Sequence, residues 1–459
     1  MVFFKKLKIL IFGSDISFSK EIKKAYKDLK GSSRLRIDTI SISFFIGKWL
    51  PFSIAIGIIT GTIASLMDLL VVQINQFLSK NIILLLIYPL LVSIIVGLVI
   101  NKYSTVEGPG IGYAILHLKT KQYIPLKVIF WKIIISVLTL SGGFIAGREG
   151  PSFFLGVALG ERTGKIYGFG KKFKNLLGLI GGGAFTGALL KAPLGSSIFA
   201  MELENMYDFD YRPFIPMIVA AIISYLTFSF FRGNHPFILL KEKPMWNLTT
   251  IPYIVFMGII IAIVSYIYTF IFHLMQRASQ AFNPIRRPII GTLFAIPILG
   301  LLYIIIDNQE ILSAPANMVI LSDIANNQMP IITDIAIIIG TILITSFTLA
   351  FGIPGGLILP VLIFGAATGN IFGHFFPQNL VTFTLAGMGA ALAATAKTPL
   401  AAIVMITEMS HDDVVIPMTA AVITSYLLSF GYSTYLGQKN IFKGDLKTFT
   451  SRIIDNVHH

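Results

Sequence analysis

The sequence predicts an all-α polytopic membrane protein built from two related halves. Two observations predict this fold: apolar runs long enough to span a bilayer, and a series of glycine–proline motifs that occurs twice at the same spacing. Of the 459 residues, 55% are hydrophobic and only 13% are charged. Soluble proteins carry about 25% charged residues. The composition therefore excludes an ordinary soluble domain.

Apolar runs along the chain define the membrane class. A helix needs about 20 apolar residues to cross the bilayer core, whereas a β-barrel shows alternating segments of about 10 residues. The runs are Leu50–Val72, Ile82–Ile100, Val128–Ile145, Phe214–Phe231, Ile251–Phe272, Ile289–Ile306, Ile335–Phe351 and Val414–Leu428. They predict membrane helices and not a barrel. The polar stretch Asp307–Asp334 predicts an extramembrane loop.

Much of the net charge of +14 lies near the N-terminus. Residues 1–48 hold eleven lysines and arginines against four acidic residues, a local charge of +7. Basic segments beside membrane spans stay in the cytosol and touch anionic lipid, so we expect no nucleic-acid partner. Met1–Gly13 shows no small-residue cleavage site. It predicts part of an amphipathic interfacial helix and not a signal peptide.

The first glycine-rich motif follows the second apolar run. Gly108, Pro109, Gly110 and Gly112 fall within five residues, and such a set interrupts any helix. Taken alone, this motif favours a surface turn.

The second motif, Gly147-Arg148-Glu149-Gly150-Pro151, places two charges between hydrophobic runs. Each charge costs roughly 2.5–3.5 kcal/mol at the centre of a membrane helix on insertion scales. Glycine permits unusual dihedrals, and proline suits the first turn of a helix. The motif therefore predicts a helix that begins inside the membrane and whose free N–H groups form an anion site facing a cavity. Glu149 would occupy the place of an anion. The alternative is a buried structural ion pair between Arg148 and Glu149.

The same motifs occur in the second half. Glycines follow Pro151 at offsets of 5, 9 and 13 residues, and glycines follow Pro360 at the same three offsets. Such spacing places small residues on one helix face and allows close helix packing in lipid. A duplicated unit with helices interrupted at matching places indicates a midplane site between the repeats. The spacing leaves open whether the repeats are parallel or inverted.

Charged residues repeat as well. Lys191 and Lys397 each stand two residues before a proline, and Glu202 and Glu408 each lie nine residues after it. We expect both lysines at helix ends or the membrane interface, and both glutamates satisfying helix N-termini or other polar groups.

Together these motifs resemble the CLC family of chloride channels and chloride/proton antiporters, in its bacterial type without cytoplasmic regulatory domains. The matching motifs are G-R-E-G-P at 147–151, G-x-G-I at Gly108–Ile111, G-G-x-x-x-P at Gly355–Pro360 and E-M-x(7)-P at Glu408–Pro417. The resemblance covers about residues 40–436. It implies a homodimer in which each subunit has its own anion path and two inverted halves of tilted, broken helices.

We accordingly predict five segments. A basic cytosolic or interfacial segment covers 1–48, and the first membrane half covers 49–235. A linker at 236–250 leads to the second half at 251–436, and a short cytosolic tail covers 437–459. The expected location is a bacterial inner membrane with both termini in the cytosol.

The resemblance also implies the anion ligands. They would be the Gly108-Pro109-Gly110 loop, the backbone amides of Arg148, Glu149, Gly150, Leu357 and Ile358, and a tyrosine hydroxyl near the C-terminus. The family's S-x-Y pattern selects Tyr435, with Tyr432 and Tyr426 as alternatives. Glu149 would be the gate: it fills the anion site when ionised and swings out when protonated or displaced.

Two departures from the family pattern concern the anion and the proton. Pro109 stands where the family has a serine, so a hydroxyl donor is lost, and proline there is associated with nitrate preference. Leu203 stands where many proton-coupled members carry an inner glutamate. We expect chloride, nitrate or another small anion to be exchanged for protons. The alternative is a passive anion channel.

Other function classes find no support in the sequence. There is no cysteine, so disulfides and thiolate metal sites are excluded, and the seven histidines show no metal spacing. The sequence shows no set of acid–base residues and no activated nucleophile that would indicate an enzyme. We expect no cofactor.

Overall fold

The computed structural model describes residues 34–120, 122–170, 173–204, 213–306, 318–429 and 433–435. Regular structure in these residues is helical apart from one isolated β-bridge. The chain divides into two compact units, Met1–Phe52 and Ser53–His459. Residues 1–33 of the predicted basic segment, the alternative Tyr432 and the predicted tail at 437–459 lie outside the described residues.

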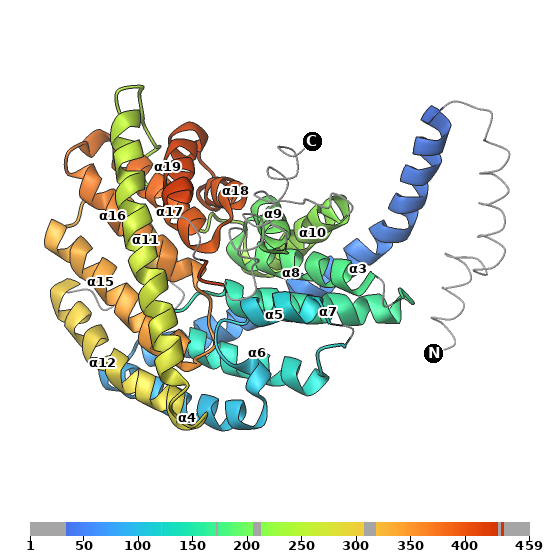
Figure 1. Ribbon diagram of the computed structural model, residues 1–459, viewed down its shortest axis with the longest axis horizontal. Coiled ribbons are helices and arrows are strands. Elements are labelled where there is room, and N and C mark those ends of the chain that lie inside the picture. The colour runs from blue at the N-terminus through green and yellow to red at the C-terminus, as the bar shows by residue number, and fades with distance from the viewer. Residues whose placement is uncertain are drawn as a thin grey trace, which may run out of the picture. The chain divides into compact units, whose positions relative to one another are not determined.

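The helices are drawn and labelled in Figure 1. The first half holds α3 Arg34–Leu78, α4 Ile82–Lys102, α5 Ile111–Leu118, α6 Leu126–Leu140, α7 Glu149–Ile166, α8 Lys174–Leu190, α9 Pro193–Glu204 and α10 Phe214–Arg232. The second half holds α11 Ile251–Ser279, α12 Arg286–Ile306, α14 Met318–Asn326, α15 Ile331–Thr348, α16 Ile358–Gly373, α17 Leu380–Ala396, α18 Pro399–Ser410 and α19 Val415–Leu428.

In the described part of the chain, six stretches are long and apolar enough to cross a membrane. They lie in α3, α4, α10, α11, α12 and α15, the last continuing to Phe351. Six of the predicted apolar runs are thereby confirmed as candidate spans. The other two form shorter helices, α6 with 15 residues and α19 with 14. α6 stops early because Gly142 and Gly143 follow it, and Gly143 has a φ of 75° that interrupts the helix.

The prediction of a loop over Asp307–Asp334 is wrong for its C-terminal part. α14 and the start of α15 lie within that stretch, and Asp334 is fully buried in the first turn of α15. An acidic residue suits the first turn of a helix because the free N–H groups there carry partial positive charge. The polar character of Asp334 therefore marks a helix start and not a loop.

Matching helices in the two halves pack alike. α7 lies against α8 as α16 lies against α17, and Figure 1 shows the two pairs in separate groups of helices. A Cβ atom on Gly156 would lie 2.8 Å from the Cα of Gly182, and one on Gly369 would lie 2.7 Å from the Cα of Thr384. No side chain fits at either contact. The glycine rows therefore bring backbones together, as their spacing predicts.

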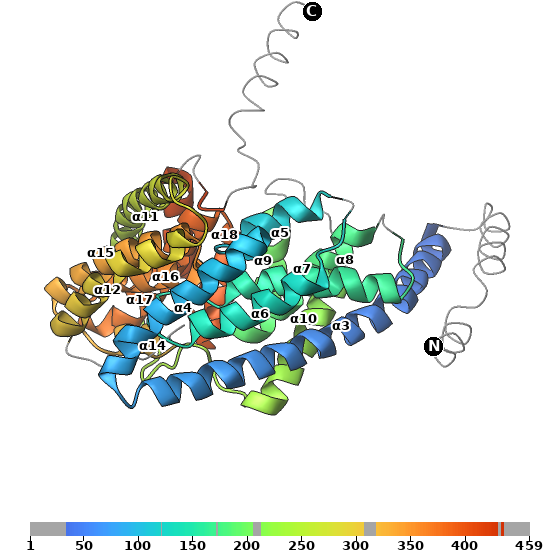
Figure 2. The same ribbon diagram turned by 90° about the horizontal axis from the view of Figure 1, so that it is seen from below.

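The broken helices are surrounded by longer ones. α6 packs on both α4 and α7, which can be followed in Figure 2. α11 packs on α15, α16, α17 and α19. The N-termini of α7 and α16 are therefore held inside the helical unit formed by Ser53–His459.

We predict that Gly156→Ala lowers the free energy of unfolding by about 1–3 kcal/mol, the usual cost of overpacking. The added methyl group would push α7 away from α8. The measurement is thermal unfolding of the purified protein in detergent. Gly300→Ala in α12 is the matched control, because a Cβ there meets nothing within 4 Å. A Gly156→Ala variant as stable as the control would contradict this account of the packing.

Candidate functional site

The site begins where two broken helices start side by side. The N–H of Gly147 donates to the carbonyl of Gly356 at 2.8 Å, and the N–H of Gly356 donates to the carbonyl of Gly147 at 2.6 Å. α7 starts two residues after the first glycine and α16 two residues after the second. The positive ends of both helices therefore meet, and such ends attract negative charge.

The negative charge at this place is the Glu149 carboxylate. Glu149 is fully buried, and its Oε1 accepts a hydrogen bond from the N–H of Ile358. The N–H groups of Ile358, Leu359 and Glu149 itself all interact with the carboxylate. Its Oε2 has no hydrogen-bond partner among the described residues. The carboxylate thus occupies a position with several convergent backbone donors, as an anion would.

Two glycines make room for this carboxylate. A Cβ atom on Gly356 would lie 2.6 Å from Oε2 of Glu149, and one on Gly147 would lie 2.5 Å from its Cδ. Gly150 is needed for a different reason: its Cβ would lie 2.7 Å from the carbonyl oxygen of Gly355. Glycine at these positions is therefore explained by close approach and not by turn formation.

Arg148 is bonded to Asp68 and not to Glu149. Its Nη1 donates to Oδ1 of Asp68, and Nε of Arg232 donates to Oδ2 of Asp68 at 2.6 Å. The alternative of an Arg148–Glu149 ion pair is therefore wrong. Sequence reasoning missed Asp68, although an acidic residue inside the run Leu50–Val72 could have been noticed as a buried charge in need of a partner.

Two cavities lie in this region of the structure. A large cavity of about 260 Å³ is lined by residues that include the Gly108–Gly110 loop, Leu357 and Tyr435. A small cavity of about 10 Å³ is lined by Arg148, Glu149 and Ile358 among others. Leu357 of the large cavity and Ile358 of the small one are adjacent, so both cavities lie beside this peptide, and the Glu149 carboxylate is bonded to its N–H group. The structure thus brings the predicted ligands together, but it divides them between two cavities. Gly150 lines neither.

Of the two candidate tyrosines that the structure describes, it brings one to this place. Tyr435 lines the large cavity and packs edge-on against Phe199, with ring centroids 6.4 Å apart. Tyr426 is half-buried in α19 and does not line either described cavity. The role of Tyr435 as an anion ligand stays a prediction.

The Gly108–Gly110 loop is not the surface turn that its composition favours. Gly108 and Gly110 are buried and have φ values of 61° and 85°, in the left-handed region where glycine is favoured. Lys132 of α6 is fully buried beneath the loop, and its Nζ donates to the carbonyls of Val106 at 2.8 Å and Gly108 at 3.0 Å. Sequence reasoning missed Lys132, whose signal was a single charge in the run Val128–Ile145.

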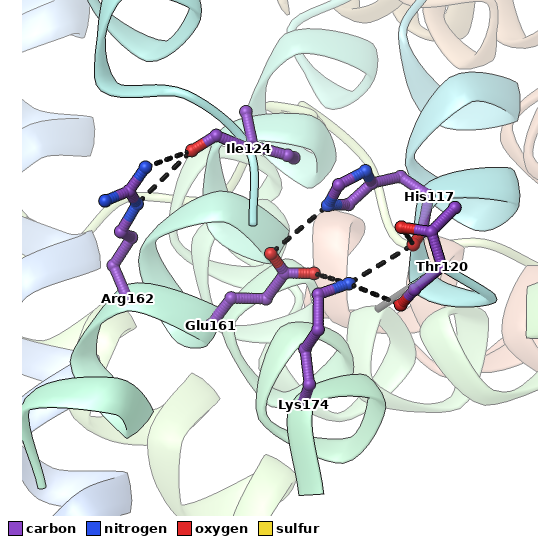
Figure 3. A network of polar contacts seen from close by, with 6 residues as sticks. All are labelled: His117, Thr120, Ile124, Glu161, Arg162 and Lys174. Atoms are coloured by element: carbon purple, nitrogen blue, oxygen red, sulfur yellow. Dashed lines mark hydrogen bonds and ion pairs between the residues drawn. The ribbon is translucent and has the colours of Figure 1, made fainter. Parts of the chain in front are cut away.

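A buried polar network holds the far end of α5, the helix that follows this loop (Figure 3). Nζ of Lys174 donates to the carbonyls of His117 at 3.2 Å and Thr120 at 3.1 Å, and it lies 2.8 Å from Oε1 of Glu161. The His117 ring lies 3.3 Å from the other oxygen of Glu161. A cation at a helix C-terminus is favourable. The network therefore fixes α5, whose other end begins at the cavity.

The repeated charges have the structural roles that the sequence predicts. Oε1 and Oε2 of Glu202 accept hydrogen bonds from Leu400 and Ala401 at the start of α18, at 3.1 and 2.8 Å. Glu408 accepts equivalent bonds from Leu194 and Gly195 at the start of α9, at 3.1 and 2.7 Å.

Both repeated lysines end helices. Lys191 and Lys397 follow α8 and α17 with φ values of 54° and 60°. Leu203 is buried and carries no ionisable group. Across the described residues, no group of three or more acidic or histidine side chains could hold a metal ion.

Comparison with known families gives a match over most of the chain. The family described as "Voltage gated chloride channel" matches residues 92–429. An uncharacterized protein of Methanocaldococcus jannaschii is 24% identical over 390 residues, which are 83% of this chain and 93% of that protein. The H(+)/Cl(-) exchange transporter ClcA of Yersinia pestis bv. Antiqua (strain Angola) is 26% identical over 333 residues, covering 70% of this chain and 68% of that protein.

Solved structures show the same fold. A CLC-type fluoride/proton antiporter superposes with a TM-score of 0.74 at 21% identity, covering 84% of this chain and 96% of that one. A slow cyanobacterial Cl-/H+ antiporter gives a TM-score of 0.73 at 21% identity, covering 88% of this chain and 98% of that one. The all-helical membrane fold expected from the sequence is thereby confirmed.

We predict that Asp68→Asn lowers the free energy of unfolding by about 3–5 kcal/mol, because it leaves buried arginine charge without its counter-ion. Glu107→Gln is the matched control. Its pair with Arg287 spans 3.1 Å, and the Glu107 side chain is 29% exposed. Such partly exposed pairs contribute about 0–1 kcal/mol. Thermal unfolding of both variants tests this, and equal losses would show that Asp68 is not a buried counter-ion.

Proposed function

Because the chain belongs to the voltage-gated chloride channel family, called CLC, we propose that it exchanges a small inorganic anion for protons across a membrane, with Glu149 as the gate. Membership makes it an integral membrane protein of an anion-transport family and not an enzyme. The passive anion channel is the alternative within that family.

One observation carries the proposal: the Glu149 carboxylate stands where the N-termini of α7 and α16 meet, at the small cavity and beside the Leu357–Ile358 peptide. When ionised, it competes with an anion for the same backbone donors. When protonated, it loses most of its attraction to the positive helix ends and can leave. The same event therefore admits an anion and takes up a proton, which is the minimum that exchange requires.

Two observations bear on exchange against passive conduction. The relative ClcA is described as an H(+)/Cl(-) exchange transporter, and this favours exchange. Leu203 has no proton to give, and Glu202 is bonded to the start of α18, so neither supplies an inner proton acceptor in this arrangement. Exchange therefore needs water in the large cavity to bring protons to Glu149.

The transported anion is chloride, nitrate or another small anion. The loop that lines the large cavity holds Pro109 between Gly108 and Gly110. Proline has neither a hydroxyl nor a backbone N–H, so the loop lacks the donor that serine would offer. We therefore expect a stronger preference for nitrate over chloride than in relatives that have serine at this position.

The remaining proposals concern partners and location. We infer a homodimer in a bacterial inner membrane, with both termini in the cytosol and the basic segment 1–48 at the lipid surface. The segments proposed as membrane halves remain 49–235 and 251–436, joined by a linker at 236–250. We expect no cofactor and no nucleic-acid partner.

The experiment uses purified protein in liposomes with an outward anion gradient and no proton gradient. We predict that anion efflux drives protons inward against the gradient that builds up, and that anion flux rises as the pH falls because protonation frees the gate. Chloride and nitrate are tested separately. Anion flux without proton movement would establish the channel alternative, and absence of any anion flux would refute the transport proposal.

In the same assay, we predict that Glu149→Gln abolishes proton movement and removes the pH dependence of anion flux, since glutamine cannot ionise. Glu242→Gln makes the same chemical change at an exposed residue between α10 and α11 and serves as the control. If Glu149→Gln and wild type showed the same pH-dependent flux, Glu149 would not be the gate.

We predict that Pro109→Ser raises the preference for chloride over nitrate by about tenfold. The restored hydroxyl can donate to the anion, and a hydrogen bond to a charged group contributes about 1.5–3 kcal/mol. The measurement is the ratio of chloride to nitrate flux under equal gradients. An unchanged ratio would remove Pro109 from the account of selectivity.

A further inference from the structure

Tyr268 on α11 is a buried tyrosine whose hydroxyl lacks a partner. The side chain is fully buried, and its Oη has no hydrogen-bond partner among the described residues. Buried polar atoms in folded proteins are nearly always hydrogen-bonded, and buried tyrosine hydroxyls are no exception. We therefore expect the hydroxyl to have a hydrogen-bond partner that is not among the described side chains and backbone groups.

The Tyr268 side chain lies close to residues of the proposed anion path. It interacts electrostatically with the Glu149 carboxylate, and the Tyr435 hydroxyl interacts with both groups. The Tyr268 ring packs against Phe272, which lines the large cavity, with ring centroids 6.1 Å apart. It also packs against Phe364 of α16, at 5.4 Å. Three polar groups therefore converge from α7, α11 and the C-terminal segment.

Packing alone does not explain a tyrosine at this position. The ring contacts are with phenylalanines, and a phenylalanine would make the same contacts without burying a hydroxyl. A buried hydroxyl without a partner is destabilising, so it indicates a requirement other than packing. Oε2 of Glu149, also buried and unpartnered within the described residues, lies in the same region.

We propose that the Tyr268 hydroxyl is an anion ligand that donates a hydrogen bond to a small inorganic anion between the two cavities. It supplies the hydroxyl donor that Pro109 cannot offer, from α11 instead of from the loop after α4. A phenolic O–H is a suitable donor to chloride or nitrate because each accepts hydrogen bonds strongly when little water is present. This assignment rests on the proposed anion transport.

The test compares Tyr268→Phe with wild type in titration calorimetry of the detergent-purified protein with sodium chloride and with sodium nitrate. The variant removes one hydroxyl and keeps the ring. We expect the Kd to rise by about tenfold or more, as for loss of a hydrogen bond to a charged group. Tyr266→Phe is the matched control: it makes the same change two residues away, on a side chain that is 48% exposed.

A second measurement separates an anion ligand from a structural hydroxyl. In anion-depleted buffer (gluconate as the counter-ion), Tyr268→Phe should melt at or above the wild-type temperature, because the unpartnered hydroxyl is gone. Added chloride should then stabilise the variant less than it stabilises wild type, since the stabilisation by a ligand grows as ln(1 + [L]/Kd) and is smaller when the Kd is higher.

The outcomes are distinct. A raised Kd with a reduced chloride-dependent stabilisation supports the proposal. If wild type binds the anion and Tyr268→Phe binds it with the same Kd, the assignment of Tyr268 is overturned. The proposed transport is not affected by that outcome. Absence of any chloride or nitrate binding by wild type, together with absence of anion flux in liposomes, overturns the transport proposal and this assignment with it.

Discussion

The structure depends on one interaction, the placement of the Glu149 carboxylate against the N–H groups at the start of α16. A helix that begins inside a membrane leaves its first N–H groups without partners, and lipid cannot satisfy them. Two such helices start together at the bridge between Gly147 and Gly356. A negative group is therefore favourable there, and in the structure the Glu149 carboxylate supplies it.

The surrounding packing follows from keeping these helix ends close together. Glycine rows let α7 approach α8, and α16 approach α17, at backbone distance. Buried charges are then compensated one by one, away from the carboxylate. Asp68 balances Arg148 and Arg232, Lys132 holds the Gly108–Gly110 loop, and the His117–Glu161–Lys174 network holds the far end of α5. None of these contacts involves the Glu149 carboxylate.

Three glutamates of this structure each lie against a helix start in the opposite half. Glu202 and Glu408 each satisfy the start of a helix in the other half, so their hydrogen bonds tie the repeats together. Glu149 also satisfies a helix start in the other half, but it does so beside two cavities. This position supports the proposal that Glu149 acts as a gate and not only as a helix cap.

The sequence alone determined the membrane class, the duplication and the position of Glu149. These properties are local: apolar length, matched glycine offsets and a charged residue beside helix-breaking residues are all readable along the chain. Tertiary structure alone decided that Asp68 is the partner of Arg148, that Lys132 lies beneath the Gly108–Gly110 loop and that the buried Tyr268 packs against Phe364 of α16. Those pairings join residues far apart in the chain, and a buried charge or hydroxyl can be satisfied by any suitable group that folding brings near it. Only the packed helices specify which group that is.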